Sequence, residues 1–423
     1  MEATQLAVPD PFVLFDGEAG RGMSACTMAA FPDFGFSKNE VRRAGEVIAS
    51  SLVWSPETEE EILQAFKVAN SWRDSHAYPM RSIRNSVIQH IHHAGLDGLT
   101  AARLKRMQAI RRKLRRTGAT FLLNQLQDLG GCRAIMDDIG GVRVLADRLR
   151  SQMRHEIRKE DDYISNPKGD GYRCHHLMLS FVPDDPERAS FAGRRIELQI
   201  RTRLQHSWAT AVEAVGLFRG EDLKGHQGSP EWLRLFSLIS AEFAEMEGCP
   251  LPPGTLDKAD RVSEIKRLAG ELSAAKTLES IKHGVRGTDF PISPNYRPTH
   301  YLIVFDHATQ SVRVTPAAAP VNAAVLYDSA EFHDNRADSD TQTVVLVEVD
   351  KMESLKAAYP NYFGDVTLFG EQLESITRTG FGFGYGVAPR QPAPRPREKW
   401  GDLSWLRRRR FPQPSLKDPE KKE

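Results

Sequence analysis

The stretch RRIELQIRT, residues 194–202, alternates apolar and polar side chains. Successive side chains of a β-strand point to opposite faces, so the apolar residues share one face and Glu197, Gln199 and Arg201 share the other. We expect the apolar face to pack into a core. The polar face is either solvated, the more common state of such residues, or the floor of a binding site.

Segments of both secondary-structure types surround this strand. Apolar runs predict buried strands at 129–136 and 175–182, and helical periodicity predicts helices at 142–153 and 203–215. Upstream, helices are predicted at 57–75, at 81–94, and from Ser37, where SKNE has the pattern of a capping box. We therefore expect an α+β fold, in which helices flank a mixed or mostly antiparallel sheet.

Shifts in composition divide the chain into parts. EGCPLPPGT, residues 247–255, is typical of a linker. Before the linker we expect a loose arm at 1–36, helices at 37–98 that pack on the following unit, and an α+β unit at 99–247. After it we expect a helix with a smaller C-terminal α/β unit at 256–377, which includes strands at 300–306 and 341–350. A basic disordered tail is expected at 378–423.

The composition is typical of a globular protein of a reducing compartment. Of 423 residues, 40% are hydrophobic and 27% are charged, and the formal net charge is +1. No run of about 18 apolar residues predicts a membrane span, and the N-terminus lacks the features of a secretory signal. The four cysteines form no CxxC pair, so we expect neither disulfides nor a zinc module, and we expect a cytoplasmic location.

The segment RLKRMQAIRRKLRR, residues 103–116, contains eight basic residues and no acid. We expect it to be helical from Arg106. Long basic side chains often lie along a helix surface with their charges in water. Their mutual repulsion here is not offset locally, which favours an anionic ligand such as the phosphates of ATP or a nucleic-acid backbone.

Two carboxylates are candidates for one magnesium site. Glu197 lies on the polar face of its strand, and Asp128 stands at the start of the buried strand predicted at 129–136, where two glycines follow Leu129. Mg²⁺ is usually bound by one or two carboxylates together with substrate phosphates. The alternative for Asp128 is an ordinary cap of the strand, and Asp137 and Asp138 are rivals in a turn where Asp is common.

The loop NPKGDGYRCHH, residues 166–176, is either a surface hairpin or a nucleotide-binding loop. Lys168 could reach a phosphate, and Tyr172 could stack on a base. His175 and His176 alternate along the next strand, so one can face the core and the other the site. His90, His92 and His93 have no acid at ligand spacing, and we interpret them as structural.

Five segments in this order resemble the RelA/SpoT nucleotide pyrophosphotransferase domain. They are RLKR, KL, DLGGCR, YISNPKGDGYRCHH and ELQIRTRLQHSWA, from Arg103 to Ala209. The resemblance implies a RelA/SpoT-like, nucleotidyltransferase-type mixed sheet. It also implies Mg²⁺-dependent transfer of the β,γ-pyrophosphate of ATP to a ribose 3′-hydroxyl, usually of GDP or GTP, which makes ppGpp and pppGpp.

The resemblance assigns a role to individual residues. Asp128 and Glu197 match the metal ligands, and Glu197 also matches the acid that helps to activate the 3′-hydroxyl. The positions that match the ATP-binding residues are Arg103, Lys105 and Lys113. The positions that match the acceptor-binding residues are Lys168, Tyr172, His176, Gln199, Arg201 and His206. Cys174 and His175 depart from the usual serine and leucine, which leaves the acceptor open.

Other features leave three functions to compare. The segments resemble hydrolase-free, stand-alone synthetases with a C-terminal extension, some of which are toxins restrained by an antitoxin, by another protein or by their own C-terminal part. The alternatives to a guanosine acceptor are the 3′-CCA end of tRNA, as in a translation toxin or phage-defence protein, and a catalytically silent nucleotide or RNA sensor. Tyr359 and Tyr362 either plug the nucleotide site or pack within the C-terminal unit.

Overall fold

The computed structural model describes residues 34–53, 55–115, 121–225, 228–284, 286–288, 300–306, 311–317, 342–348 and 366–384, together with residues 298, 309, 326–327 and 330. The α-helices are α1 (Lys38–Ala49), α2 (Glu59–Asp74), α3 (Ala77–His93), α4 (Met107–Leu114), α5 (Ile139–Gln152), α6 (Arg203–Arg219), α7 (Pro230–Met246), α8 (Lys258–Glu271), α9 (Ala274–Gly284) and α12 (Thr367–Thr379). The strands are β1 (Gly98–Leu104), β2 (Gly130–Met136), β3 (Glu156–Asp162), β4 (His175–Ser180), β5 (Arg195–Thr202), β6 (Arg286–Thr288), β7 (His300–Asp306), β8 (Ser311–Ala317) and β9 (Gln342–Glu348). Short 3₁₀ helices are η1 (Leu123–Gln125), η2 (Pro186–Phe191) and η3 (Leu223–Gly225).

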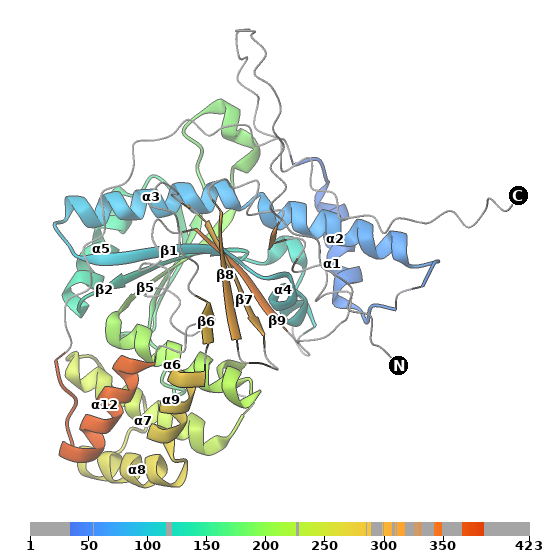
Figure 1. Cartoon of the computed structure of the whole chain (residues 1–423). Coiled ribbons are helices and arrows are strands. Elements are labelled where there is room, and N and C mark those ends of the chain that lie inside the picture. Colours follow the sequence, from blue (N-terminus) through green and yellow to red (C-terminus); the bar gives the residue numbers. More distant parts are fainter. Residues whose placement is uncertain are drawn as a thin grey trace, which may run out of the picture.

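The described strands form one sheet, in the order β3-β4-β5-β2-β1-β9-β7-β8-β6. β2 pairs with β5 in parallel, as does β6 with β8, and the other neighbours are antiparallel. The expected α+β fold with a mixed sheet flanked by helices is therefore confirmed (Figure 1).

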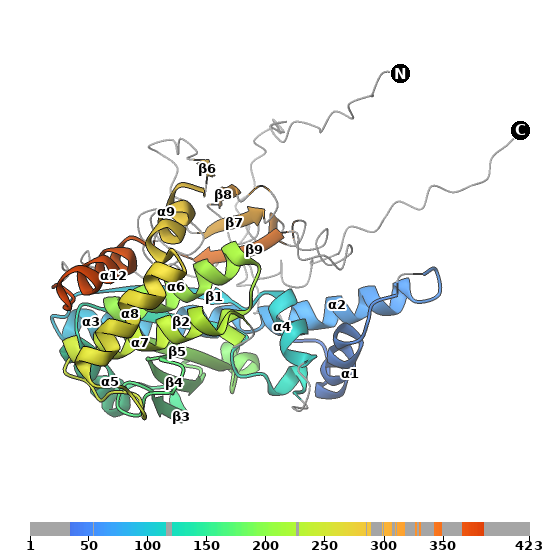
Figure 2. The same ribbon diagram turned by 90° about the horizontal axis from the view of Figure 1, so that it is seen from below.

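Helices cover the two faces of the sheet. α3 and α5 pack on the face where Leu198 of β5 and Cys132 of β2 are buried. Figure 1 shows α6, α7 and α8 on the opposite side of the sheet from α3, and Figure 2, seen from below, shows them in front of β1, β2 and β5. The apolar residues of β5, Ile196, Leu198 and Ile200, are fully buried, as their alternation predicts. The polar residues of β5 therefore face the side of the sheet where α6 and α7 lie.

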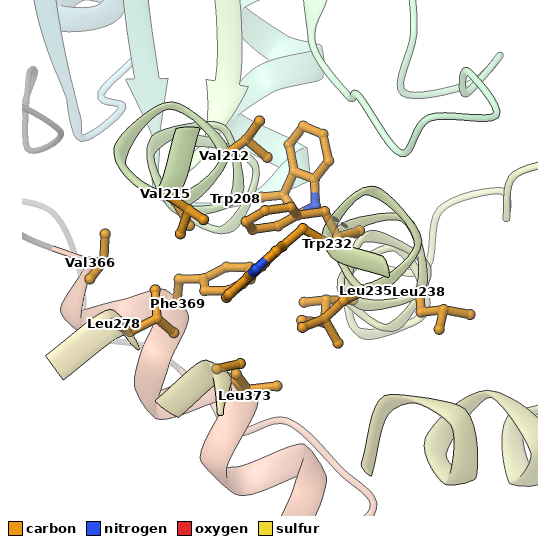
Figure 3. Packing of buried hydrophobic residues seen from close by; sticks show 14 of the residues in the cluster. Trp208, Val212, Val215, Trp232, Leu235, Leu238, Leu278, Val366, Phe369 and Leu373 are labelled. Carbon is orange, nitrogen blue, oxygen red and sulfur yellow. Dashed lines mark hydrogen bonds between the residues drawn. The ribbon is translucent and has the colours of Figure 1, made fainter. Parts of the chain in front are cut away.

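The C-terminal strands and helices continue the structure of the preceding part. β9 pairs with β1, and Arg106 donates a hydrogen bond to Thr343 Oγ1 of β9 at 3.0 Å. One hydrophobic cluster joins α6 and α7 to α8, α9 and α12 (Figure 3). Inside this helical layer, Arg261 of α8 forms a buried ion pair with Glu242 of α7 at 2.5 Å. The expected C-terminal α/β unit thus shares its sheet and its helical core with the α+β unit.

Several predicted elements are confirmed. The capping box at Ser37 and Glu40 is present, and the helices and strands predicted from 37 to 215 are found with small shifts of their ends. The single helix expected at the start of the part at 256–377 is wrong: it is two helices, α8 and α9, separated near Ser273, whose φ is +47°. The elements that the sequence did not predict are β1, β3, β6, β8, α7 and α12.

Other predictions lie outside the described residues. These are the arm up to residue 33, the tail beyond residue 384, and the pair Tyr359 and Tyr362. In the described ranges, every helix is too short or too polar to cross a bilayer.

Candidate functional site

A cleft of about 1090 Å³ opens on the face of the sheet that α6 and α7 border. Most of the predicted site residues line it: Arg103, Lys105, Asp128, Lys168, Tyr172, His176, Glu197, Gln199 and Arg201. Lys113 is not among the lining residues, but its Nζ binds Asp128, which lines the cleft. His206 is buried on α6 and is not among the residues that line the cleft. Sequence positions about a hundred residues apart therefore meet at one place.

The strand register brings these side chains together. In the sheet, Arg103 of β1 is opposite Gly131 of β2, and Gly131 is opposite Glu197 of β5. Opposite residues in neighbouring strands point to the same face. A Cβ at Gly131 would have no neighbour closer than the Arg103 carbonyl oxygen at 3.8 Å, so the backbone of β2 leaves space between Arg103 and Glu197.

Asp128 is held by two lysines. Its Oδ2 accepts hydrogen bonds from Lys105 Nζ at 2.8 Å and from Lys113 Nζ at 2.9 Å. Burial favours the neutral acid, but the two lysine charges outweigh it and lower the pKa of Asp128 to about 2. Its Oδ1 is buried and accepts no hydrogen bond from any residue that the structure describes. One carboxylate oxygen is thus left for a further positive ligand.

Glu197 receives a hydrogen bond on each carboxylate oxygen. His176 Nδ1 lies 3.0 Å from Oε1, and Gln199 Nε2 donates to Oε2 at 3.0 Å. The Gln199 amide is itself oriented by Arg201, which donates to Gln199 Oε1. Burial raises the pKa of Glu197, but the hydrogen bond and charge of His176 outweigh burial and lower it below its usual value. Glu197 is therefore ionised at neutral pH and its position is fixed.

His176 links Glu197 to the loop at 166–176, the predicted acceptor loop. Its Nε2 lies 2.8 Å from the Tyr172 hydroxyl, on the opposite side of the ring from Glu197. Burial opposes a charge on His176, but interactions with Cys174 and Glu197 raise its pKa above the usual value. His175, the next residue in the strand, points into the protein and pairs with Glu160 Oε1 at 2.6 Å. The expected alternation of the two histidines is therefore present.

The loop between β3 and β4 brings a lysine into an aromatic cluster. Lys168 Nζ lies 4.0 Å from the centre of the Tyr163 ring and 5.6 Å from that of Tyr172. The Tyr172 ring lies 6.4 Å from that of Trp208 on α6. A base that stacks on Tyr172 would therefore meet an ammonium group and a second aromatic wall.

Several cleft residues are not among those predicted from the sequence. Arg133 lies two positions after Gly131, on the same face of β2, so the strand period could have identified it. Glu213 of α6 is paired with Lys224 at 2.7 Å. Burial raises the pKa of Glu213, but Lys224, Arg133 and Arg103 together lower it well below its usual value. No local signal marks Glu213, because only the fold brings it to these cations.

The rival acids have a structural role or lie elsewhere. Asp138 is the N-cap of α5 and accepts a hydrogen bond from the Gly141 amide at 2.7 Å. Asp137 is not among the residues that line the cleft. Among the described residues, no group of three His, Cys, Asp or Glu side chains could hold a metal ion. Of the four acids considered from the sequence, Asp128 and Glu197 are the two that line the cleft.

Comparison with known proteins connects this site to a family. Residues 102–219 match the family described as "Region found in RelA / SpoT proteins". GTP pyrophosphokinase YwaC of Bacillus subtilis (strain 168) is 30% identical over 115 residues, which are 26% of this chain and 54% of that protein. A GTP pyrophosphokinase of Escherichia coli (strain K12) is 25% identical over 157 residues, or 36% of this chain and 20% of that protein. The chain thus spans about half or less of these relatives.

Solved structures are also similar to this chain. A GTP pyrophosphokinase family protein from Streptococcus pneumoniae aligns with a TM-score of 0.35 and 19% identity, over 53% of this chain and 98% of that one. Small alarmone synthetase 2 of Bacillus subtilis aligns with a TM-score of 0.35 and 22% identity, over 41% of this chain and 91% of that one.

Proposed function

We propose that this protein transfers the β,γ-pyrophosphate of ATP to the ribose 3′-hydroxyl of GDP or GTP, because residues 102–219 match the RelA/SpoT family. One observation carries the proposal. A single cleft brings the carboxylates of Asp128 and Glu197 together with Arg103 and Lys105 and with the loop of Lys168 and Tyr172. Such a cleft can hold two nucleotides with their reacting groups near the carboxylates.

The cations on β1 and α4 are the proposed site of the ATP phosphates. Arg103 and Lys105 line the cleft, and Lys113 approaches it from α4. Burial lowers the pKa of Lys105, although the neighbouring Asp128 opposes this effect. A buried lysine is stabilised in its charged form by a phosphate, so binding of ATP is favoured at this place.

Asp128 and Glu197 are the proposed ligands of Mg²⁺. The buried Oδ1 of Asp128, which lacks a hydrogen bond from the described residues, suits a cation. Phosphate oxygens and water commonly complete the shell of a magnesium ion that has few protein ligands. When bound, Mg²⁺ would offset the negative charge that develops on the phosphates during transfer.

The reaction needs a base near the acceptor hydroxyl. The 3′-oxygen attacks the β-phosphorus of ATP, the bond between that phosphorus and the α,β-bridging oxygen breaks, and AMP leaves. We assign the 3′-hydroxyl proton to Glu197, because it is ionised before the reaction and is linked through His176 to Tyr172 of the proposed acceptor loop. His176 and Gln199 hold Glu197 in place for this step.

A second candidate is the same transfer onto the 3′ end of tRNA. Arg112 and Arg115 are exposed and line the cleft beyond the three cations assigned to ATP. Cations at the rim of a cleft favour a polyanion longer than one nucleotide. The reaction is unchanged, and only the acceptor differs.

The test uses the full-length protein with Mg²⁺ and ATP labelled at the γ-phosphate, and offers GDP, GTP and tRNA separately. We expect label in the guanosine nucleotides, and none with Glu197→Gln. Label on tRNA alone would show that the acceptor is tRNA and not GDP or GTP, and would leave the proposed transfer reaction in place. If the wild-type protein transfers label to no acceptor, the proposed reaction is refuted, and a silent nucleotide or RNA sensor remains.

A further inference from the structure

Helix α7 holds the acceptor loop by its backbone. Ser240 Oγ donates a hydrogen bond to the Gly171 carbonyl oxygen at 2.5 Å, and Ser237 Oγ donates to the Gly169 carbonyl oxygen at 3.2 Å. The two serines are three positions apart, so they lie on one face of the helix. A helical serine often bonds a carbonyl of its own helix. Here both hydroxyls instead bind another segment of the chain.

The contact between loop and helix is close. Gly171 has a φ of +88°, a conformation that glycine adopts without strain. A Cβ at this position would lie 2.9 Å from Ser240 Cβ and 3.1 Å from Ser237 Cα. Only a residue without a side chain therefore lets the loop lie directly on α7.

The residues fixed in this way stand next to the proposed acceptor-binding side chains. Lys168 precedes Gly169, and Tyr172 follows Gly171. The loop also bonds within itself, since the Gly171 amide donates to the Lys168 carbonyl oxygen at 3.1 Å and the Tyr172 amide donates to Asp170 Oδ1 at 2.8 Å. The serines thus fasten a small folded unit to the helix from one side.

Contacts with α6 and α12 in turn hold α7 in place. Trp208 Nε1 donates to the Phe236 carbonyl oxygen of α7 at 2.7 Å, and Phe236 packs on Phe369 of α12. Ser240 is almost fully buried. The surface that receives the loop is therefore part of the helical core and has little freedom to move.

We propose that Ser237 and Ser240 are positioning residues that hold Lys168 and Tyr172 ready for the acceptor nucleotide. This inference rests on the proposed function and adds to it a part of the acceptor site outside the matched region, since α7 follows residue 219. A loop that is ordered before binding loses less conformational entropy when the acceptor arrives. Loss of the two hydrogen bonds should therefore weaken binding of the acceptor and leave binding of ATP unchanged.

The test compares the double variant Ser237→Ala/Ser240→Ala with the wild-type protein in the transfer assay. We expect the KM for the acceptor to rise about tenfold, as the loss of two hydrogen bonds implies, with the KM for ATP unchanged. Ser237→Thr keeps the hydroxyl and should behave like the wild type. Ser280→Ala on α9 is the matched control, because among the described residues Ser280 Oγ bonds only the Lys276 carbonyl oxygen of its own helix.

Hydrogen exchange gives a readout that does not need activity. The amides of residues 169–172 should exchange faster in the double variant than in the wild type, while those of β5 should not change. An unchanged acceptor KM in a variant that folds normally would overturn this inference alone, as would equal increases in the KM of ATP and acceptor. Absence of transfer by the wild-type protein would refute the proposed function and the acceptor role with it.

Discussion

Phe369 of α12 packs against Phe236 of α7, with their ring centroids 5.5 Å apart. Phe369 is fully buried, and its ring also contacts Phe243. A segment more than a hundred residues downstream of α7 therefore completes the core on which the loop at 166–176 lies. The C-terminal part is integral to the fold of the candidate site.

Replacement of Phe369 tests this dependence. We expect Phe369→Ala to reduce the free energy of unfolding by about 3–5 kcal/mol, because the lost ring leaves a cavity in a packed core. Denaturant unfolding of the full-length protein measures the change. Phe381→Ala is the control, because this ring is 62% exposed and should cost little. Equal, small effects of both changes would show that α12 contributes little to stability.

One pair of variants distinguishes the role of Asp128 from that of Asp138. Asp128→Asn removes the charge that holds Lys105 and Lys113, and we expect transfer to fall at least about 100-fold, the scale for loss of a group that supports charge development. Asp138→Asn keeps a good helix N-cap and should retain activity. Initial rates at several Mg²⁺ concentrations provide the comparison. Near-normal transfer by Asp128→Asn would remove Asp128 from the proposed metal site.

The two glycines at the start of β2 should respond differently to alanine. A Cβ at Gly130 would lie 2.6 Å from Ile196 Cδ1 in the core, whereas one at Gly131 would face the cleft with 3.8 Å to its nearest atom. We expect Gly130→Ala to destabilise the fold by about 1–3 kcal/mol through overpacking. Gly131→Ala should fold normally and slow transfer. Thermal unfolding and the transfer assay together distinguish them, and the reverse pattern would contradict the register of β2 and β5.

His76 should make stability depend on pH. Burial and the charge of Arg194 lower its pKa from 6.5 to about 3 in the folded protein. The unfolded chain therefore takes up a proton below pH 6.5 while the folded protein does not, so stability is fully present above pH 6.5 and is lost as pH falls towards 3. The loss from this group between pH 8 and pH 5 should be about 2 kcal/mol.

The measurement for His76 is the free energy of unfolding across this pH range in the wild type and in His76→Asn. The asparagine amide can still donate to the Trp72 carbonyl oxygen, which His76 Nδ1 approaches at 2.9 Å. We expect a smaller pH dependence in the variant. Identical pH profiles would show that His76 is not held neutral in the folded protein.

The local elements and most of the candidate side chains can be predicted from the sequence alone. Alternation in RRIELQIRT fixed which residues of β5 are buried, and that period placed Glu197, Gln199 and Arg201 on one face. The capping box at Ser37 fixed the start of α1. These features depend on neighbours within a few residues, so they can be predicted from a short window.

How these elements meet depends on contacts between distant parts of the chain. Gly131 lies opposite Glu197 in a parallel pair, the loop at 166–176 binds Ser237 and Ser240, and β9 pairs with β1. Arg106 and Thr343, which are hydrogen-bonded, are 237 positions apart. Strand register and helix packing are set by shape and polar complementarity between such distant residues, and periodicity along the chain contains no information about which partner will be met.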